Sequence, residues 1–224
     1  MKNKITVVIP TLNASNTISF TLANISKYIN NIIIVDADSK DNTVQIAKKY
    51  KVKIIKSLAN RGKQLHIGAL SSNTDWLLFL HADTLLSKNS FKEMQKFIEM
   101  QPNKAGYFML KFNSNKYFAS ILEKIVYFRN KIFHLPYGDQ GLLISKKLYK
   151  NIGGFAPIPI MEDVNIIRRI GYRNLTLINS YVITDASKYI EYGWIKRTFI
   201  NVTCITLYFI GYDINKIHKI YKNE

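Results

Sequence analysis

The sequence predicts an α/β fold, in which a mostly parallel, Rossmann-like sheet is flanked by helices and followed by a C-terminal helical extension. Short apolar runs alternate with segments of helical spacing through the first half of the chain. These runs are apolar throughout, which is typical of strands covered on both faces of a sheet. The chain has 224 residues, of which 47% are hydrophobic, and this is enough to bury a full core.

The first half of the chain supplies the regular part of this pattern. Four apolar runs predict strands, at residues 5–10, 31–36, 52–57 and 76–83. Four segments with helical spacing follow them, at residues 13–28, 41–50, 62–72 and 90–100. Asp41 is expected to cap the second of these helices. Strands joined by helices of this length form parallel pairs, so ligands are expected at the carboxyl ends of the strands.

The second half is less regular. A strand is expected at residues 106–113 and an aromatic-rich helix at 116–133. Residues 136–155 read as a loop, a strand, a short helix and a glycine turn, and residues 161–172 as a helix that opens with two acids. From Tyr192 to Tyr221 we expect one long helical stretch that is both basic and apolar.

Charge and composition limit the partners and the compartment. The formal net charge of +17 suggests a polyanion such as nucleic acid, an anionic membrane face or phosphorylated substrates. Lysine greatly outnumbers arginine, whereas a nucleic-acid reader would depend more on arginine, so we expect no nucleic acid and attribute much of the charge to coding bias. A single cysteine, Cys204, excludes an intrachain disulfide framework.

No segment has the length of a membrane span or a signal peptide. The apolar run near the N-terminus is too short for a signal peptide, and residues 198–211 are too short and too mixed for a span. We therefore expect a cytoplasmic protein and leave open peripheral contact with the inner face of the membrane.

Polar side chains cluster where the predicted strands end. A carboxylate at a strand end, as at Asp36, can accept hydrogen bonds from a base edge or a ribose hydroxyl. The alternative for Asp38 and Ser39 is a turn that leads into the next helix. The clustered residues are Thr11 and Asn13 after the first strand, Asp36 and Asp38 after the second, and His81 and Asp83 after the fourth.

Two further motifs suit phosphates and metal ions. Arg61 and Gly62 begin a helix, where the dipole and a guanidinium both favour an anion, unless the arginine is merely solvated. His81 and Asp83 would point the same way on an extended segment, and Asp83 could bind Mg²⁺ or Mn²⁺. A histidine ligand would tolerate manganese better. The alternative is that Asp83 only caps a turn with Thr84.

Two acidic stretches complete the candidates. Residues 137–141, YGDQG, are either an acceptor-binding loop or only a loop before a strand. Glu162 and Asp163 lie on the first turn of a helix, where the dipole favours negative charge. Because adjacent helical side chains point in different directions, we expect at most one of the two acids to face a cleft.

Together these motifs resemble a known family. PTLNAS, VDADSKD, the arginine-glycine helix start, FLHAD, YGDQG and GGF…MED occur in the order seen in family-2 glycosyltransferases with the GT-A fold. HAD, PYGDQG and PIMED resemble a bacterial subgroup of that family, and the resemblance covers about residues 4–185. It implies a nucleotide-diphosphate sugar donor, a divalent Mn or Mg ion, and inverting transfer by a catalytic domain over residues 1–190. Residues 191–224 would form a basic amphipathic helical extension.

The resemblance also implies roles for individual residues. A metal and Arg61 would stabilise the charge of the leaving diphosphate, and one carboxylate would take the acceptor proton. Asp163 would be this catalytic base. The nucleotide-sugar site would include Pro10, Thr11, Asn13, Asp36, Asp38, Arg61 and Ala82; the metal site Asp83 with His81; and the acceptor site Asp139, Gln140 and Glu162.

Departures from the family pattern keep alternatives open. Ala14 stands where the family usually has Glu, and His81 where it has the first Asp of the metal motif. The Q-x-x-R-W motif and the spans of processive synthases are absent from this sequence, which favours transfer of one sugar, with a lipid, cell-envelope glycan or polysaccharide as acceptor. The rivals are a nucleotidyltransferase, which would usually have a glycine- and arginine-rich loop after the first strand, and a basic membrane- or nucleic-acid-binding module. The C-terminal stretch either lies on an anionic membrane or packs on the catalytic domain.

Overall fold

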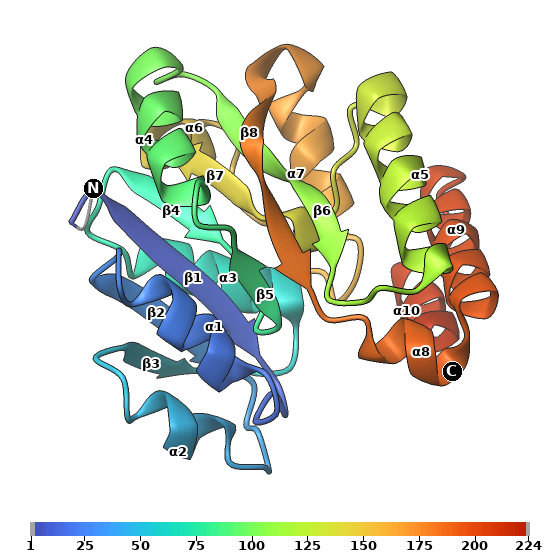
Figure 1. The fold of residues 1–224 in the computed structure, drawn as a ribbon, viewed down its shortest axis with the longest axis horizontal. Coiled ribbons are helices and arrows are strands. Elements are labelled where there is room, and N and C mark those ends of the chain that lie inside the picture. The colour runs from blue at the N-terminus through green and yellow to red at the C-terminus, as the bar shows by residue number, and fades with distance from the viewer. Residues whose placement is uncertain (1–2, 223–224) are drawn as a thin grey trace.

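The computed structural model describes residues 3–222, and within them eight strands form one mixed sheet in the order β3-β2-β1-β4-β7-β6-β8-β5 (Figure 1). The first half is parallel, as predicted, and it joins β3 (Lys53–Lys56), β2 (Asn31–Asp36), β1 (Ile5–Thr11) and β4 (Trp76–Phe79). The predicted α/β class, with a mostly parallel sheet flanked by helices, is confirmed.

The second half of the sheet mixes strand directions. β7 (Leu142–Ser145) is antiparallel to β4 and to β6 (Ala105–Phe112), and β6 runs parallel to β8 (Leu175–Thr184). β5 (Thr84–Leu86) forms the far edge against β8. Sequence reasoning missed both β8 and β5, and it extended the fourth strand to residue 83. The chain instead leaves β4 after Phe79, and the next strand, β5, pairs with β8. This partner lies almost a hundred residues later in the sequence, so no local pattern indicates it.

The helices of the main body are α1 (Ile18–Ile25), α2 (Thr43–Ala47), α3 (Arg61–Leu70), α4 (Ser90–Met100), α5 (Tyr117–Phe133), α6 (Lys146–Asn151) and α7 (Glu162–Ile170), with short 3₁₀ turns η1 (Gly138–Gln140) and η2 (Tyr172–Asn174). Of the main-body helices with a predicted start, all but α1 begin within two residues of it. The helix expected from residue 13 begins only at Ile18, because Asn13 adopts a left-handed conformation with a φ of 51°.

The C-terminal stretch begins at the last residue of α8 (Ser187–Tyr192) and then holds two helices, α9 (Trp194–Phe209) and α10 (Ile214–Lys222), so the expectation of one long helix is wrong. Gly193 and Gly211 separate them, with φ values of 86° and 80° that a right-handed helix does not allow. Of the predicted domain and extension, residues 1–2 and 223–224 lie outside the described part. None of the described helices is both long enough and apolar enough to cross a membrane.

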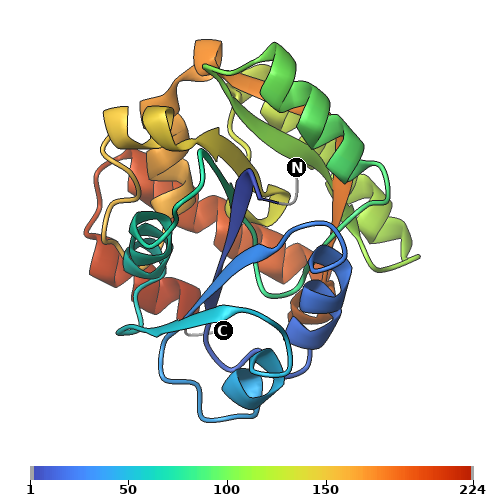
Figure 2. The ribbon, with the colours of Figure 1, turned by 90° about the vertical axis from the view of Figure 1, so that its left-hand side faces the viewer.

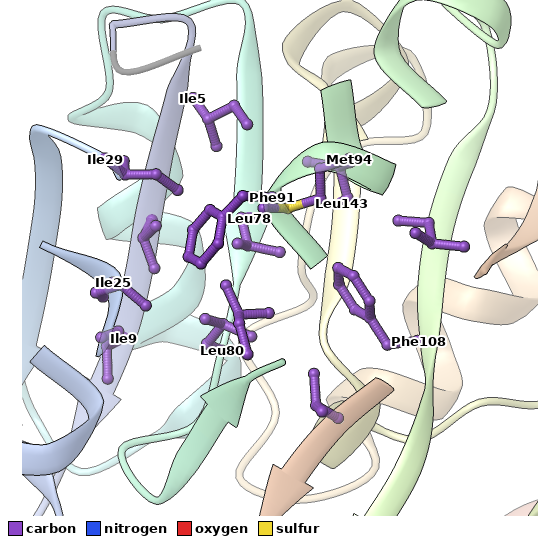
Figure 3. Packing of buried hydrophobic residues seen from close by; sticks show 14 of the residues in the cluster. Ile5, Ile9, Ile25, Ile29, Leu78, Leu80, Phe91, Met94, Phe108 and Leu143 are labelled. Atoms are coloured by element: carbon purple, nitrogen blue, oxygen red, sulfur yellow. The ribbon is translucent and has the colours of Figure 1, made fainter. Parts of the chain in front are cut away.

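The core lies in two layers, one on each face of the sheet. Successive residues of β1 point to opposite faces, so Ile9 packs into one apolar cluster and Val8 into the other. Figure 3 shows the first cluster, where Ile9 and Leu80 lie on the same side as Met94 and Phe108. Figure 2 shows helices on both sides of the strands. This arrangement holds the carboxyl ends of β1, β2 and β4 at one edge of the sheet.

Candidate active site

The carboxyl ends of β1 and β2 carry a closed set of hydrogen bonds, which we call the strand-end network (Thr11, Asn13, Asp36 and Ser39). Thr11 lies opposite Asp36 in the sheet and donates to its Oδ1 at 2.8 Å. Ser39 donates to Asp36 twice, from its backbone N to Oδ2 at 2.9 Å and from its hydroxyl to Oδ1 at 2.6 Å. Asp36 is buried. Both of its carboxylate oxygens therefore have partners, and the carboxylate is held in place.

The two loops that follow these strands are tied together by Asn13. Its backbone N donates to the Ser39 hydroxyl at 2.9 Å, and its Oδ1 accepts from the backbone N of Lys40 at 2.8 Å. Asn13 and Asp38 both have positive φ, a conformation that Asn and Asp adopt more readily than other residues. Asp38 is exposed and paired with Lys40, and this hydrogen bond and charge lower the pKa of Asp38. Pro10 is half-buried between the strands.

Gln64 supports this network and was missed by sequence reasoning. It is buried in α3, and its Nε2 donates to the carbonyl of Thr11 at 3.0 Å and to that of Val35 at 2.8 Å. One amide thus spans the ends of β1 and β2. The signal that could have revealed it is a polar residue beside Leu65 on the buried face of a helix.

The start of α3 is pressed against the segment that precedes the two acids. A Cβ atom on Gly62 would lie 2.0 Å from the carbonyl oxygen of Ala156, so only glycine fits there. Asn60 accepts from the backbone N of Lys63 as the helix cap, and its Nδ2 donates to the carbonyl of Pro157 at 3.0 Å. These contacts bring Arg61, about a hundred residues away in sequence, to the start of α7.

Arg61 forms an ion pair with Glu162, its Nε lying 3.2 Å from Oε1. Glu162 is buried, and burial raises its pKa to about 7 although Arg61 opposes the shift. The charge of Glu162 in turn raises the pKa of Arg61. No hydrogen-bond partner of Glu162 Oε2 is found among residues 3–222. The pair is therefore only partly satisfied by the protein itself.

Asp163 is positioned by backbone donors. Its Oδ2 accepts from the N of Gly138 at 2.7 Å, and its Oδ1 accepts from the N of Val164 at 2.7 Å. The preceding residue, Met161, has a φ of 61°, a left-handed conformation that costs about 1–3 kcal/mol outside glycine and is often found at functional sites. The chain thus bends sharply just before the two acids.

A cavity of about 20 Å³, room for about one water molecule, lies beside these acids. Both Glu162 and Asp163 line it, together with apolar side chains such as Leu65, Phe155 and Ile166. Glu162 is buried and Asp163 is half-buried. That at most one of the two acids faces a ligand cleft stays a prediction. His81 and Gly138 line the same cavity.

His81 faces Gly138 across a very short gap. A Cβ on Gly138 would lie 2.8 Å from His81 Nε2 and 3.3 Å from Asp163 Oδ2. Burial, assisted by the charge of Arg61, lowers the pKa of His81 to about 3. The imidazole is therefore neutral at pH 7, and Gly138 lets the loop approach both side chains.

The loop that carries Gly138 is anchored by Arg129, which sequence reasoning also missed. Its Nη2 donates to Gln140 Oε1 at 2.8 Å, and its guanidinium lies 3.5 Å from the centroid of the Tyr137 ring. Gln140 is buried and its Nε2 donates to the carbonyl of Phe108 at 2.8 Å, so both ends of its amide already have protein partners. An arginine in a lysine-rich chain was the available signal.

Asp139 lies on the same loop and is less well satisfied. Burial raises its pKa to about 6 against the charge of Arg129. No group within the described part of the chain hydrogen-bonds its Oδ1. With Glu162 and Asp163 it forms what we call the acid cluster (Asp139, Glu162 and Asp163), of which Glu162 is buried and the other two are half-buried. A ligand with hydroxyl donors would satisfy the open oxygens of this cluster.

Asp83 follows His81 by two residues. Burial raises the pKa of Asp83, and Lys188 and Asp185 are among the charges that act on it. The charge of Lys188 also acts on His81, together with those of Arg61 and Asp163. Within residues 3–222, no group of three His, Cys, Asp or Glu side chains could hold a metal ion. A lone carboxylate such as Asp83 fits an ion that takes its other ligands from substrate phosphates and water. Next to it, the carbonyl of Ala82 accepts from the Thr21 hydroxyl at 2.9 Å.

The sequence and the fold are similar to those of known glycosyltransferases. The family model "Glycosyl transferase family 2" matches residues 6–158. An uncharacterized glycosyltransferase of Rickettsia conorii is 30% identical over 132 residues, which are 58% of this chain and 43% of that protein, so the chain spans less than half of this relative. The crystal structure of S. aureus TarS 1-349 in complex with UDP-GlcNAc has a TM-score of 0.66 at 17% identity and covers 97% of this chain and 70% of its own. That of Mycobacterium tuberculosis glucosyl-3-phosphoglycerate synthase with Mn²⁺, UDP-glucose and phosphoglyceric acid has a TM-score of 0.55 at 16% identity and covers 78% and 69%.

Proposed function

The chain belongs to glycosyl transferase family 2, and on this premise we propose that it moves one sugar from a nucleotide-diphosphate sugar to an acceptor hydroxyl, with inversion at the anomeric carbon. The observation that carries the proposal is Asp163, a carboxylate fixed by the N of Gly138 beside Arg61 and a neutral His81. Family membership favours this activity over a nucleotidyltransferase and over a binding module.

Donor binding is proposed at the carboxyl ends of β1 and β2. Thr11 and Asp36 would meet the nucleoside, since a fixed carboxylate can accept from a base edge or a ribose hydroxyl. Pro10, Asn13 and Asp38 would form the adjoining loop walls. The bound UDP-GlcNAc and UDP-glucose of the two structural neighbours support a nucleotide-sugar donor.

The leaving diphosphate would develop negative charge near Arg61. Arg61 can donate to it while remaining paired with the buried Glu162, which keeps the guanidinium in place. A divalent Mn or Mg ion held by Asp83, with Ala82 and His81 nearby, would act as a Lewis acid on that diphosphate. The Mn²⁺ in the mycobacterial neighbour supports this proposal.

The acceptor would be activated by Asp163. An inverting transfer needs one base to take the acceptor proton and no covalent intermediate, and Asp163 can accept the proton while the N of Gly138 holds its position. Asp139 has an open oxygen that could accept from a second acceptor hydroxyl, and Glu162 borders the same space. Gln140 would act by holding this loop. A lipid or a cell-envelope glycan or polysaccharide is the proposed acceptor class.

A panel of nucleotide sugars, each with Mn²⁺ or with EDTA, tests the proposal. We expect one class to raise the melting temperature and to release nucleoside diphosphate, and EDTA to suppress the release. Asp163→Asn should lower the turnover by about 10²–10⁴-fold, the usual contribution of a general base, while the donor still raises the melting temperature. Asp75→Asn, an exposed acid at the other end of β4, is the matched control. Full turnover by Asp163→Asn would exclude this residue as the base.

A further inference from the structure

Helix α5 exposes a row of large apolar side chains. Phe118, Ile125, Phe128 and Ile132 follow one another at spacings of seven, three and four residues, which places them on one side of the helix. Their exposed fractions lie between 48% and 63%. The adjoining side of α5 packs on the core through Ala119, Leu122 and Val126. This row is therefore a second apolar surface of α5, separate from the side that packs on the core.

Helix α9 repeats the same arrangement. Ile195, Phe199, Val202 and Phe209 also lie on one side of their helix, with exposed fractions between 49% and 74%. Its buried side packs through Cys204 against Ile160. Figure 1 shows α5 and α9 at the same end of the molecule, and in Figure 2 both lie on the side away from the viewer. We call the two exposed rows together the apolar end face.

The exposed charged residues on α5 and α9 themselves are all basic. Lys116, Lys124 and Lys131 of the α5 segment and Lys196 of α9 are exposed. The only acid between residues 113 and 136 is Glu123, and its Oε1 is bound to the backbone N of Phe112 at 2.8 Å. Residues 194–212 contain no Asp or Glu. A basic rim around an apolar row with several aromatic rings matches the interface of an anionic bilayer.

We propose that the apolar end face docks this protein on an anionic lipid bilayer. Apolar side chains at this spacing would enter the boundary between headgroups and acyl chains, and the lysines would contact anionic headgroups. A protein partner or a second copy would also bury apolar surface, but the exposed lysines and the lack of exposed acids on α5 and α9 favour a surface of uniform negative charge.

The place of α5 links this face to the acceptor side of the site. Arg129 of α5 donates to Gln140, and the N of Gly138 on the same loop donates to Asp163. Docking through α5 would therefore hold the loop and the carboxylate of Asp163 close to the bilayer. This step rests on the proposed function, and it implies an acceptor hydroxyl carried on a membrane lipid in preference to one on a free glycan.

Vesicle sedimentation tests the docking directly. We expect the wild-type protein to sediment with vesicles that contain phosphatidylglycerol, less with phosphatidylcholine alone, and less as salt is added, because salt screens the lysines. The paired variant Phe128→Ser with Ile132→Ser should bind anionic vesicles at least about tenfold more weakly. Leu70→Ser with Met100→Ser removes two equally exposed apolar side chains from α3 and α4 and should bind as wild type.

A charge pair separates the electrostatic part of the binding. Lys124→Glu with Lys131→Glu should weaken binding to anionic vesicles about tenfold, whereas Lys48→Glu with Lys49→Glu should have little effect. Failure of the wild type to sediment, or equal losses in the α5 variants and their controls, would overturn the proposal. The proposal would also be overturned if the wild type did not bind vesicles but formed a dimer in solution, and if Phe128→Ser with Ile132→Ser dissociated that dimer.

The two proposals fail separately. Release of nucleoside diphosphate without vesicles should be the same in the wild type and in the α5 variants, because the exposed row touches none of the proposed site residues. If vesicle binding is absent while this turnover persists, only the docking proposal falls. If turnover is absent while vesicle binding follows the expected pattern, only the proposed function falls.

Discussion

The strand-end network and the acid cluster lie at the same edge of the sheet, but Asp36 of the first and Asp139 and Glu162 of the second differ in how their oxygens are hydrogen-bonded. Both oxygens of Asp36 accept hydrogen bonds from Thr11 and Ser39. In the acid cluster, Asp139 and Glu162 each keep one buried oxygen without a hydrogen-bond partner in the described chain, and burial raises the pKa of both.

Carboxylates that differ in this way are suited to different tasks. A carboxylate whose bonds are complete has a fixed orientation and gains little from new partners, which suits recognition of a ligand. A carboxylate with an open oxygen and a raised pKa, such as Asp139 or Glu162, is destabilised in the folded protein, which is typical of a group that awaits a ligand. Asp163 of the same cluster accepts hydrogen bonds at both oxygens, so its orientation is fixed as that of Asp36 is. The expected effects of mutation should therefore differ in kind between the two regions.

The largest expected effect is the pH dependence of stability that Glu162 contributes. Its pKa rises from 4.5 to about 7 on folding. Below pH 4.5 both states hold the proton, so there is no penalty. As the pH rises to about 7, the unfolded state loses its proton first, and the free energy of unfolding should fall by about 3 kcal/mol. Urea unfolding at several pH values should show this slope in the wild type and a reduced slope in Glu162→Gln.

The matched control is Glu99→Gln, an exposed acid on α4, which should keep the slope of the wild type. Because Asp139 has a pKa of about 6, some slope should remain in Glu162→Gln. If the free energy of unfolding changed with pH by the same amount in the wild type and in Glu162→Gln, ionised Glu162 would not destabilise the folded protein.

The next effect tests how closely the acid cluster is packed. In Gly138→Ala the added Cβ would meet His81 Nε2 at 2.8 Å and Asp163 Oδ2 at 3.3 Å, so both side chains must shift. A displacement of about 1 Å at a reacting group can cost about 10²-fold, so kcat should fall about a hundredfold. Gly171→Ala, where no atom lies within 4 Å but φ is 75°, should cost stability and leave kcat unchanged. Equal kcat values for both variants would refute close packing here.

The two regions also differ in what the sequence could reveal. The strand-end network could be predicted because its members lie at or just after the ends of two buried strands. Its hydrogen bonds join two loops that the parallel pairing of these strands brings together. The acid cluster depends on contacts such as Gly62 against Ala156 and Gly138 against His81, which no local pattern encodes. The missed β8 has the same origin, since its partners β6 and β5 are distant in sequence.

A smaller effect is expected within the strand-end network. Asp36→Asn places an amide NH₂ where one oxygen accepts from Ser39, so at least one hydrogen bond is lost. If Asp36 serves binding, the donor KM should rise about tenfold while kcat stays within about threefold. Thr11→Val removes one donor and leaves the contacts of Ser39, so its effect on KM should be smaller. A fall in kcat as large as that of Asp163→Asn would remove the distinction between the two regions.

The smallest effect concerns Asn60, whose side chain joins the start of α3 to the segment before α7. Its Oδ1 caps α3 and its Nδ2 donates to the carbonyl of Pro157. Asn60→Ala loses both bonds and should lower the free energy of unfolding by about 1 kcal/mol, the usual value of a helix cap. Asn60→Asp keeps an acceptor for the cap but cannot donate to Pro157, so it should retain most of the stability. Its turnover should nevertheless fall, because the loosened contact lets the segment before Glu162 move away from Arg61. If Asn60→Asp matches the wild type in both stability and kcat, the alignment of the two regions depends on Gly62 alone.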